Sequence, residues 1–171
     1  MPIFVLNAVF EMEAVDKFEV PSDTTWTFDI KQGAGDEEKK GVVIDPDEED
    51  EVPNTKNTVA NLVVKFPGDK SHSYLRVIKP GELKGLVTQP ITGEDAQKSK
   101  MVPIAAFECR GLEPTRWYPT GPYTVTSISG TTYEDVDLRN EEWCEYDEKS
   151  GEAMTLSKEP TQQEFKLFRG K

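Results

Sequence analysis

Alternation of apolar and polar residues with a period of two constrains this chain more than any other feature. In the segment TTWTFDI (24–30), Trp26, Phe28 and Ile30 fall on one face, and the polar residues fall on the other. The segment ANLVVKF (60–66) alternates in the same way. This pattern is typical of strands that bury one face only. It therefore predicts a chain built largely from half-buried strands.

Further segments rich in β-forming residues occur at SYLRVI (73–78), PYTVTSIS (122–129) and EFKLF (164–168). Proline and glycine turn signals separate these segments at short intervals. A helix is expected only over residues 93–100, where a loop is equally compatible with the sequence. Many short strands with regular turns are typical of sandwiches and barrels. We therefore expect an all-β, single-domain fold over residues 1–171, sandwich-like or barrel-like.

The charge of the chain excludes some classes of partner. The sequence carries 32 acidic and 20 basic residues, a formal net charge of −12. Binding to nucleic acid or to anionic lipid requires clusters of lysine and arginine, which this sequence lacks. The apolar start of the chain reads as a strand rather than a signal peptide, and two cysteines make no disulfide framework. We expect a monomer in the cytoplasm, with the nucleus as the alternative compartment.

An internal repeat is visible in the sequence. The segment FVLNAVFEMEAVD can be laid over MVPIAAFECRGLE by a shift of 97 residues, which takes Phe10 to Phe107. The same shift lays Trp26 over Tyr123. It also lays the glycine turn that follows the first of these strands over the glycine turn that follows the second. Repeats of this kind indicate duplication of a supersecondary unit. The prediction is one β fold made of two pseudo-repeated halves, roughly 1–90 and 98–171.

Two polar segments have compositions that occur in ligand sites. The segment KQGAGDEE (31–38) contains Gly33 and Gly35, but it lacks the third glycine and the following helix of a phosphate-binding loop. The run from 45 to 51 contains six acids, but neither the spacing nor the internal glycine of a calcium loop. We interpret the first segment as a turn and the second as a solvated, mobile loop.

Three motifs carry a family resemblance. They are FECRGLEP (107–114), SGTTYEDVDL (129–138) and EEWCEYDEK (141–149), in that order. Together with the strand segments near the N-terminus, they resemble the eukaryotic family called DUF866 or UPF0587, the CXXC-motif-containing zinc-binding proteins. The resemblance covers nearly the whole chain. It implies an all-β single domain with two related halves, of poorly defined activity.

The resemblance also implies a structural zinc held by two Cys-x-x-Cys knuckles in the first half. The corresponding positions here are Gln32, Gly35, Phe66 and Asp69, so all four thiolates are absent. A closed zinc site needs four ligands, which are mostly thiolate or imidazole. The sequence therefore predicts a divergent member that binds no metal and no other cofactor.

A rebuilt metal site is the alternative. His72, the single histidine of the chain, follows the second knuckle position and could gather with Asp69 and Asp36. Carboxylates are harder and weaker zinc ligands than thiolates, which makes His72 a weak candidate. In this alternative, the chain is a metal-handling protein with a degenerate or rebuilt zinc site.

The sequence predicts neither an enzyme nor any catalytic residue. Carboxylates are plentiful, but no spacing selects an acid–base pair. Cys109 lies in a strand-like segment and is expected to be buried, and Cys144 lies among acids. The expected role is that of a non-enzymatic intracellular binding or adaptor protein with an unidentified protein partner.

Five residues of the family motifs are candidates for a partner-binding face. Tryptophan, tyrosine and arginine are enriched at interface hot spots. The structural alternative is that the tryptophan packs in the core and the arginine pairs with an acid. A hairpin turn is expected over 146–151. The candidates are Arg110, Glu113, Trp143, Tyr146 and Asp147.

Overall fold

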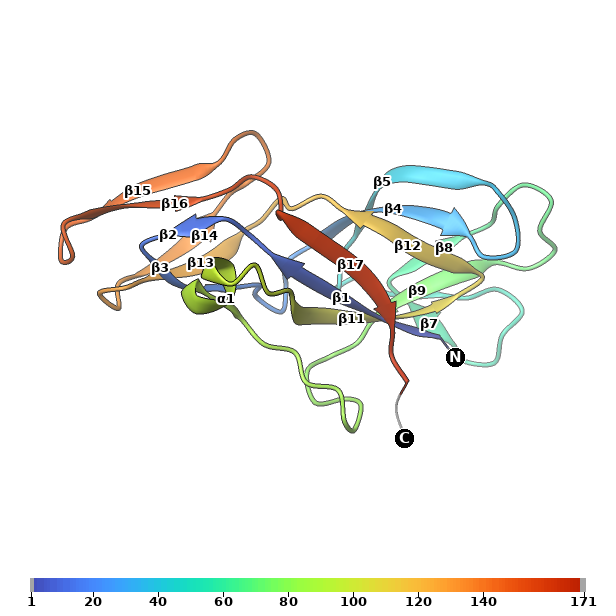
Figure 1. Ribbon diagram of the computed structural model, residues 1–171. Helices are drawn as coiled ribbons and strands as arrows, with labels where there is room; N and C mark the ends of the chain where they lie inside the picture. The colour runs from blue at the N-terminus through green and yellow to red at the C-terminus, as the bar shows by residue number, and fades with distance from the viewer. Residues whose placement is uncertain (1, 170–171) are drawn as a thin grey trace.

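A computed structural model describes residues 2–169, and it is nearly all β (Figure 1). Its central sheet is antiparallel. In spatial order its strands are β17 (Gln162–Leu167), β1 (Ile3–Val9), β11 (Val102–Arg110), β9 (Ser73–Val77) and β8 (Leu62–Val64). The predicted all-β fold of a single domain is confirmed.

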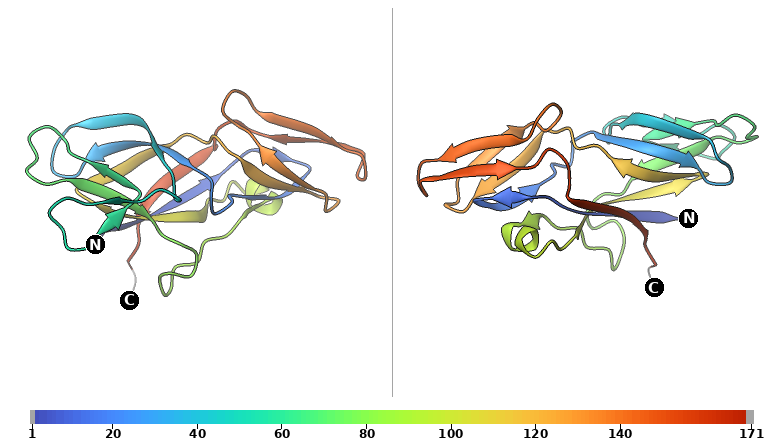
Figure 2. Two further views of the ribbon diagram at one scale, coloured as in Figure 1. Left: turned by 180° about the vertical axis from the view of Figure 1, so that it is seen from behind. Right: turned by 45° about the horizontal axis from the view of Figure 1, so that its top comes forward.

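Smaller sheets extend the molecule on both sides of the central sheet (Figure 2). On one side lie β12 (Leu112–Trp117), β4 (Trp26–Gln32) and β5 (Glu38–Ile44), with a short ribbon of β6 (Asp50–Glu51) and β7 (Val59–Ala60) nearby. On the other lie β10 (Ile91–Thr92), β3 (Val15–Glu19), β13 (Tyr123–Ser127) and β14 (Thr132–Val136) in one sheet, and β15 (Trp143–Asp147), β16 (Glu152–Leu156) and β2 (Met12–Glu13) in another.

The segment 93–100 begins with the helix α1 (Gly93–Gln97), so one of the two expected structures is present. Thr92 caps the helix by accepting a hydrogen bond from the backbone of Asp95, and the Asp95 side chain accepts one from the backbone of Thr92 in return. Among residues 2–169, no helix is long and apolar enough to cross a membrane.

The two halves exchange strands. β1 and β11, which the shift of 97 residues superimposes, pair antiparallel with Phe4 opposite Phe107. The same shift takes β3 onto β12 and β4 onto β13. In the structure β3 pairs with β13 and β4 pairs with β12. The β3–β13 and β4–β12 pairings are therefore equivalent under the repeat, and each joins a strand of one half to a strand of the other. As a result, each end of the molecule contains strands from both 1–90 and 98–171.

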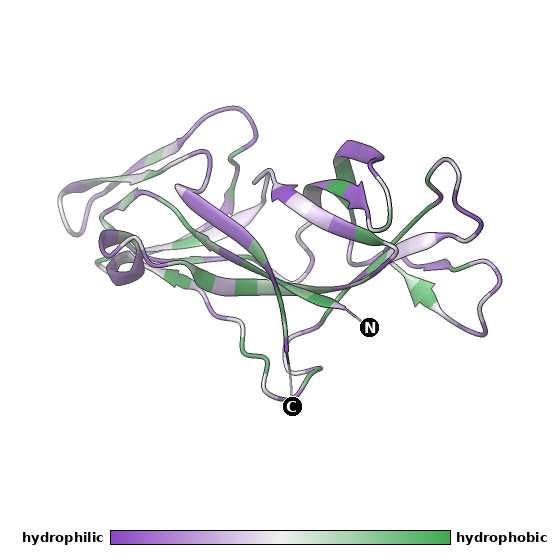
Figure 3. Cartoon of the chain, turned by 45° about the vertical axis from the view of Figure 1, so that its right-hand side comes forward, coloured by the Kyte–Doolittle hydropathy of each residue, from purple (hydrophilic) through white to green (hydrophobic). Residues whose placement is uncertain are grey.

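A chain of aromatic rings joins the two ends through the core. The ring centroids of Phe18 and Tyr123 lie 4.9 Å apart at one end. Those of Phe28 and Phe107 lie 4.9 Å apart nearer the other end. The rings that connect them are Phe10, Trp117 and Trp26. Figure 3 shows hydrophobic residues along the central strands and hydrophilic ones on the outer loops. The four aromatic positions that the shift equates, Phe10, Phe107, Trp26 and Tyr123, all belong to this chain of rings.

The second strand segment is shorter than expected. β8 ends at Val64, and Phe66 lies beyond it in a turn. The predicted face is nevertheless present, because Leu62, Val64 and Phe66 pack against one core while Val63 packs against another. The strand does not continue through Pro67, which has no backbone N–H to donate to a ladder and lies in the turn that the Asp69–Phe66 hydrogen bond closes.

We predict that Phe107→Ala lowers the free energy of unfolding by about 3–5 kcal/mol, because it leaves a cavity at the crossing of the aromatic chain and the central sheet. Phe107 is 0% exposed, whereas Tyr146 is 56% exposed. The matched control Tyr146→Ala should change the value by less than about 0.5 kcal/mol. Chemical denaturation measures both. Equal losses in the two variants would contradict this description of the core.

Candidate functional site

The four positions that the resemblance assigns to zinc ligands lie together where two hairpin turns meet. Gln32 ends β4, and its backbone N–H donates to the carbonyl of Glu37 at 2.8 Å, which closes the β4–β5 turn. Phe66 and Asp69 belong to the turn between β8 and β9. The side-chain amide of Gln32 donates to Oδ1 of Asp69 at 2.6 Å and joins the two turns. We call this contact the first tip junction.

Local sequence explains why these positions converge. Alternation along β4 places Gln32 on the buried face that begins with Trp26, so its side chain points inward. In the second turn, the N–H of Asp69 donates to the carbonyl of Phe66 at 3.1 Å. Pro67 and Gly68, whose φ is +87°, occupy the middle positions that a type II turn requires.

The residues at the first tip junction do not fit a structural zinc. Phe66 is 1% exposed and belongs to the core, and Lys39 of β5 lies 6.0 Å from its ring centroid. A Cβ at Gly35 would overlap the side-chain amide of Gln32, so that amide occupies the space toward which a residue at 35 would point. Among residues 2–169, no group of three His, Cys, Asp or Glu side chains could hold a metal.

His72 lies near the first tip junction but among unsuitable neighbours. It lines a depression of about 270 Å³ together with Asp69, Ser73 and Arg110. Asp69 and His72 are the side chains of this lining that ordinarily ligate zinc, whereas a closed site needs four ligands. Asp36 does not line it. The structure thus places His72 and Asp69 around one depression and leaves Asp36, the third proposed ligand, outside it.

The predicted partner-binding residues do not form one face. Arg110 ends β11, and Glu113 lies on β12 opposite Lys31 of β4, close to the first tip junction. Trp143 and Tyr146 lie on β15 at the opposite end of the molecule (Figure 1). The two family motifs therefore belong to separate surfaces.

At the β15 end, the side chains differ in exposure. Tyr146 is exposed, as the hairpin prediction implied, and β15 pairs with β16 across the expected turn. Trp143 is half-buried, with its ring edge against Tyr133 at 5.6 Å. Asp147 is only 1% exposed, so its prediction as a surface contact is wrong. Successive strand residues point to opposite faces, so the exposure of Tyr146 turns Asp147 inward.

Asp147 forms a second tip junction. The hydroxyl of Ser129, in the β13–β14 turn, donates to Oδ1 of Asp147 at 3.0 Å. The shift of 97 residues takes Gln32 to Ser129, so each half joins its two hairpin turns by one polar contact. Burial raises the pKa of Asp147, but serine hydroxyls, Ser129 foremost, outweigh it and hold the pKa below its ordinary value.

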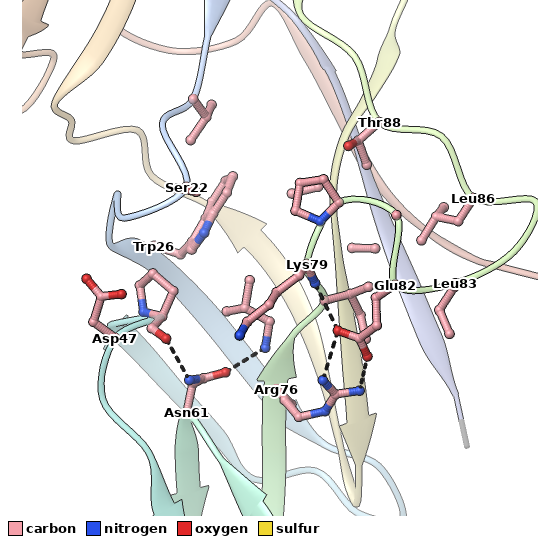
Figure 4. A pocket seen from close by; sticks show the side chains of 18 of the residues that line it. Ser22, Trp26, Asp47, Asn61, Arg76, Lys79, Glu82, Leu83, Leu86 and Thr88 are labelled. Atoms are coloured by element: carbon pink, nitrogen blue, oxygen red, sulfur yellow. Dashed lines mark hydrogen bonds and ion pairs between the residues drawn. The ribbon is translucent and has the colours of Figure 1, made fainter.

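A cavity of about 590 Å³ lies beside the central sheet (Figure 4). Its apolar lining includes Trp26 from the start of β4 and Ala105 from β11. The segment between β9 and β10 forms another wall, with Leu83, Leu86 and Thr88. Sequence reasoning missed this cavity. The long segment 79–90 between two strands was the available signal, since long connections often carry binding sites.

Three acids and two bases line the cavity, a small acidic excess. Arg76 donates to Glu82 at 2.6 Å and to Glu108 at 3.0 Å, and the guanidinium lowers the pKa of Glu82. Asp47 and Glu49 of the acidic run also line the cavity.

The acidic run has a definite shape. Its exposure matches the expectation of a solvated segment, but Asp50–Glu51 form the strand β6 rather than a loop. The side-chain amide of Asn61 donates to the carbonyls of Pro46 and Glu48, at 3.2 and 2.9 Å. The side-chain oxygen Oδ1 of Asn61 accepts a hydrogen bond from the backbone N–H of Val77. One side chain therefore ties the acidic run to the central sheet beside the cavity.

Comparison with known proteins gives one family. The family model "CXXC motif containing zinc binding protein, eukaryotic" matches residues 5–163. A human protein named CXXC motif containing zinc binding protein is 35% identical over 76 residues, 44% of this chain and 46% of its own length. A Caenorhabditis elegans UPF0587 protein is 31% identical over 112 residues, 61% of this chain and 66% of its own length. The match to the human protein thus spans about half of that protein's length.

Two solved structures share the fold. A hypothetical protein from Plasmodium falciparum has a TM-score of 0.77 and 21% identity, covering 98% of this chain and 100% of its own. The crystal structure of C1orf123 has a TM-score of 0.77 and 22% identity, covering 98% and 99%. At this level of identity, the likeness concerns the fold alone.

We predict that Gln32→Ala and Asp69→Ala are coupled. Each variant removes one end of the same hydrogen bond, so the double variant should be about 1 kcal/mol less destabilised than the sum of the single ones. Denaturant unfolding measures the four proteins of the cycle. The control pairs Gln32→Ala with Asp36→Ala, an exposed neighbour in the β4–β5 turn, and should be additive. Coupling between the Gln32 and Asp36 variants, together with additivity of the Gln32 and Asp69 variants, would refute the first tip junction.

We predict that Asp147→Asn destabilises the protein at neutral pH and that the loss shrinks in acid. A pKa lowered on folding stabilises the native state above the unfolded value of about 3.9, and this contribution disappears as the pH falls through the folded value. Urea midpoints at pH 7, 5 and 3 measure the trend. Glu148→Gln, an exposed neighbour, serves as the control. A loss of equal size at every pH would show that the charge of Asp147 contributes nothing.

Proposed function

The chain belongs to the eukaryotic family of CXXC motif containing zinc binding proteins, and we propose that it is a zinc-independent member that acts by binding another protein. The first tip junction carries the first part of this proposal. In place of four thiolates, the two turns have an amide–carboxylate hydrogen bond and the buried ring of Phe66. Both contacts can hold the turns together without a metal.

The placement of the reactive side chains favours binding over catalysis. Cys109 is buried in the core, and burial raises the pKa of its thiol well above the ordinary range. A cysteine nucleophile must be accessible and ionise readily, and the burial of Cys109 opposes both. Cys144 is exposed on β15, but His72 lies at the other end of the molecule beside β9. A Cys–His pair therefore has no support in this arrangement.

The binding role is supported by the surfaces that the fold presents. The cavity beside the central sheet has an apolar lining and a charged rim, the combination that most ligand sites share. The exposed Tyr146 and the half-buried Trp143 offer a second surface at the other end. A metal-handling role, the alternative, would require donors that the first tip junction does not supply.

We predict that the variant Gln32→Cys/Gly35→Cys/Phe66→Cys/Asp69→Cys gains about one tightly bound zinc per chain. The four positions already converge, and Gln32→Cys removes the overlap that Gly35→Cys alone would meet. Metal per chain after dialysis, measured by mass spectrometry, tests the gain. The double variant Gln32→Cys/Phe66→Cys, with two thiolates, should keep far less zinc.

The wild-type chain provides the decisive comparison. A strong zinc chelator should leave its unfolding temperature unchanged, whereas it should lower that of the four-cysteine variant. A fall in the wild-type unfolding temperature on chelation, reversed by added zinc, would overturn the zinc-independent role and favour a rebuilt metal site.

A further inference from the structure

We propose that the cavity beside the central sheet binds an extended basic segment of a partner protein, with one apolar side chain of the segment inserted between Trp26 and the 79–90 loop. This inference rests on the proposed function, because it names the site and the partner chemistry of that binding role. The apolar wall, the charge balance of the rim and the acidic run beside it support this proposal (Figure 4).

The apolar wall calls for an apolar side chain. Trp26 and Ala105 come from the core strands, and Leu83 and Leu86 come from the loop that faces them. The volume of about 590 Å³ lies within the range of binding pockets, roughly 300–1,000 Å³. Leu83 and Leu86 also pack against the small cluster of Val5, Ile78 and Ala106, which fixes the loop on the sheet.

The charge of the rim selects a cation. Arg76 is matched by two carboxylates, those of Glu82 and Glu108, so it offers no free positive charge to a ligand. Lys79 is the other cation in the lining, and Asp47 and Glu49 outnumber it. The further acids of the 45–51 run and the net charge of −12 act in the same direction.

The extent of the acidic run selects a segment rather than a small molecule. The run continues from the cavity rim at Asp47 to the ribbon strand β6 at Asp50–Glu51. Asn61 holds its first turn in place. A ligand that fills the cavity and also meets this run must extend along several residues. Basic residues that flank a central apolar one satisfy both requirements.

The test measures binding of a fluorescein-labelled nine-residue peptide. Its central residue is leucine, two lysines lie on each side of the leucine, and the remaining residues toward the two ends are neutral. Fluorescence anisotropy should show saturable binding to one site that weakens as salt is added. A twin peptide with aspartate in place of each lysine should not bind. Tighter binding of the acidic twin, through Lys79, would overturn the proposal, as would the absence of saturable binding by the basic peptide.

Two variants separate the cavity from the general acidity of the chain. Thr88→Trp places a bulky ring in the cavity and should weaken binding by about tenfold or more. Val87→Trp is its matched control, because Val87 is 71% exposed and does not line the cavity. Asp47→Lys/Glu49→Lys should weaken binding to a similar degree, whereas Glu141→Lys/Glu142→Lys, exposed at the far end, should not. Wild-type affinity in Thr88→Trp would overturn the cavity as the site.

Capture from cell extract distinguishes failure of this inference from failure of the proposed function. A partner retained by the wild type and lost by Thr88→Trp supports both. A partner retained equally by both proteins overturns the cavity and leaves the binding role intact. No stoichiometric capture by the wild type counts against both.

Discussion

The antiparallel pairing of β1 with β11 is the constraint on which the rest of the structure depends. These two strands are related by the internal repeat, and pairing them antiparallel creates a local two-fold relation with Phe4 opposite Phe107. Each half then divides its next strands between the two ends, so that β3 meets β13 at one end and β4 meets β12 at the other. The exchange makes the halves inseparable, because neither end of the molecule can form from one half alone.

The same relation explains why hairpin turns meet at both ends. At one end, Gln32 joins Asp69, and at the other Ser129 joins Asp147. A structural zinc contributes far more free energy than one hydrogen bond, on the order of 10 kcal/mol or more in small zinc domains against about 1 kcal/mol. In this fold, the turns do not depend on such a contact alone, because β4 also pairs with β12, and β9 also pairs with β11.

Sequence reasoning predicted those features that local patterns control. Alternation placed Trp26, Phe28 and Ile30 on the buried face of β4, and turn residues located the β15–β16 hairpin. The family resemblance, through the strand segment before each turn, located the four convergent positions of the first tip junction. The exchange of strands was not predicted, because an internal repeat indicates that two units are similar and not how they pair. Asp147 was misplaced because a carboxylate is ordinarily exposed, and the serine hydroxyl that compensates its burial lies 18 positions away in the chain. The cavity was missed because its walls come from five separated segments of the chain.

Native mass spectrometry of the untagged protein, purified from cells grown with added zinc, tests the central claim most directly. We predict the mass of the metal-free chain, with less than about a tenth of an equivalent of zinc. A mass that includes one zinc per folded chain would contradict this prediction. It would show that the metal has not been replaced by the Gln32–Asp69 hydrogen bond and the buried ring of Phe66.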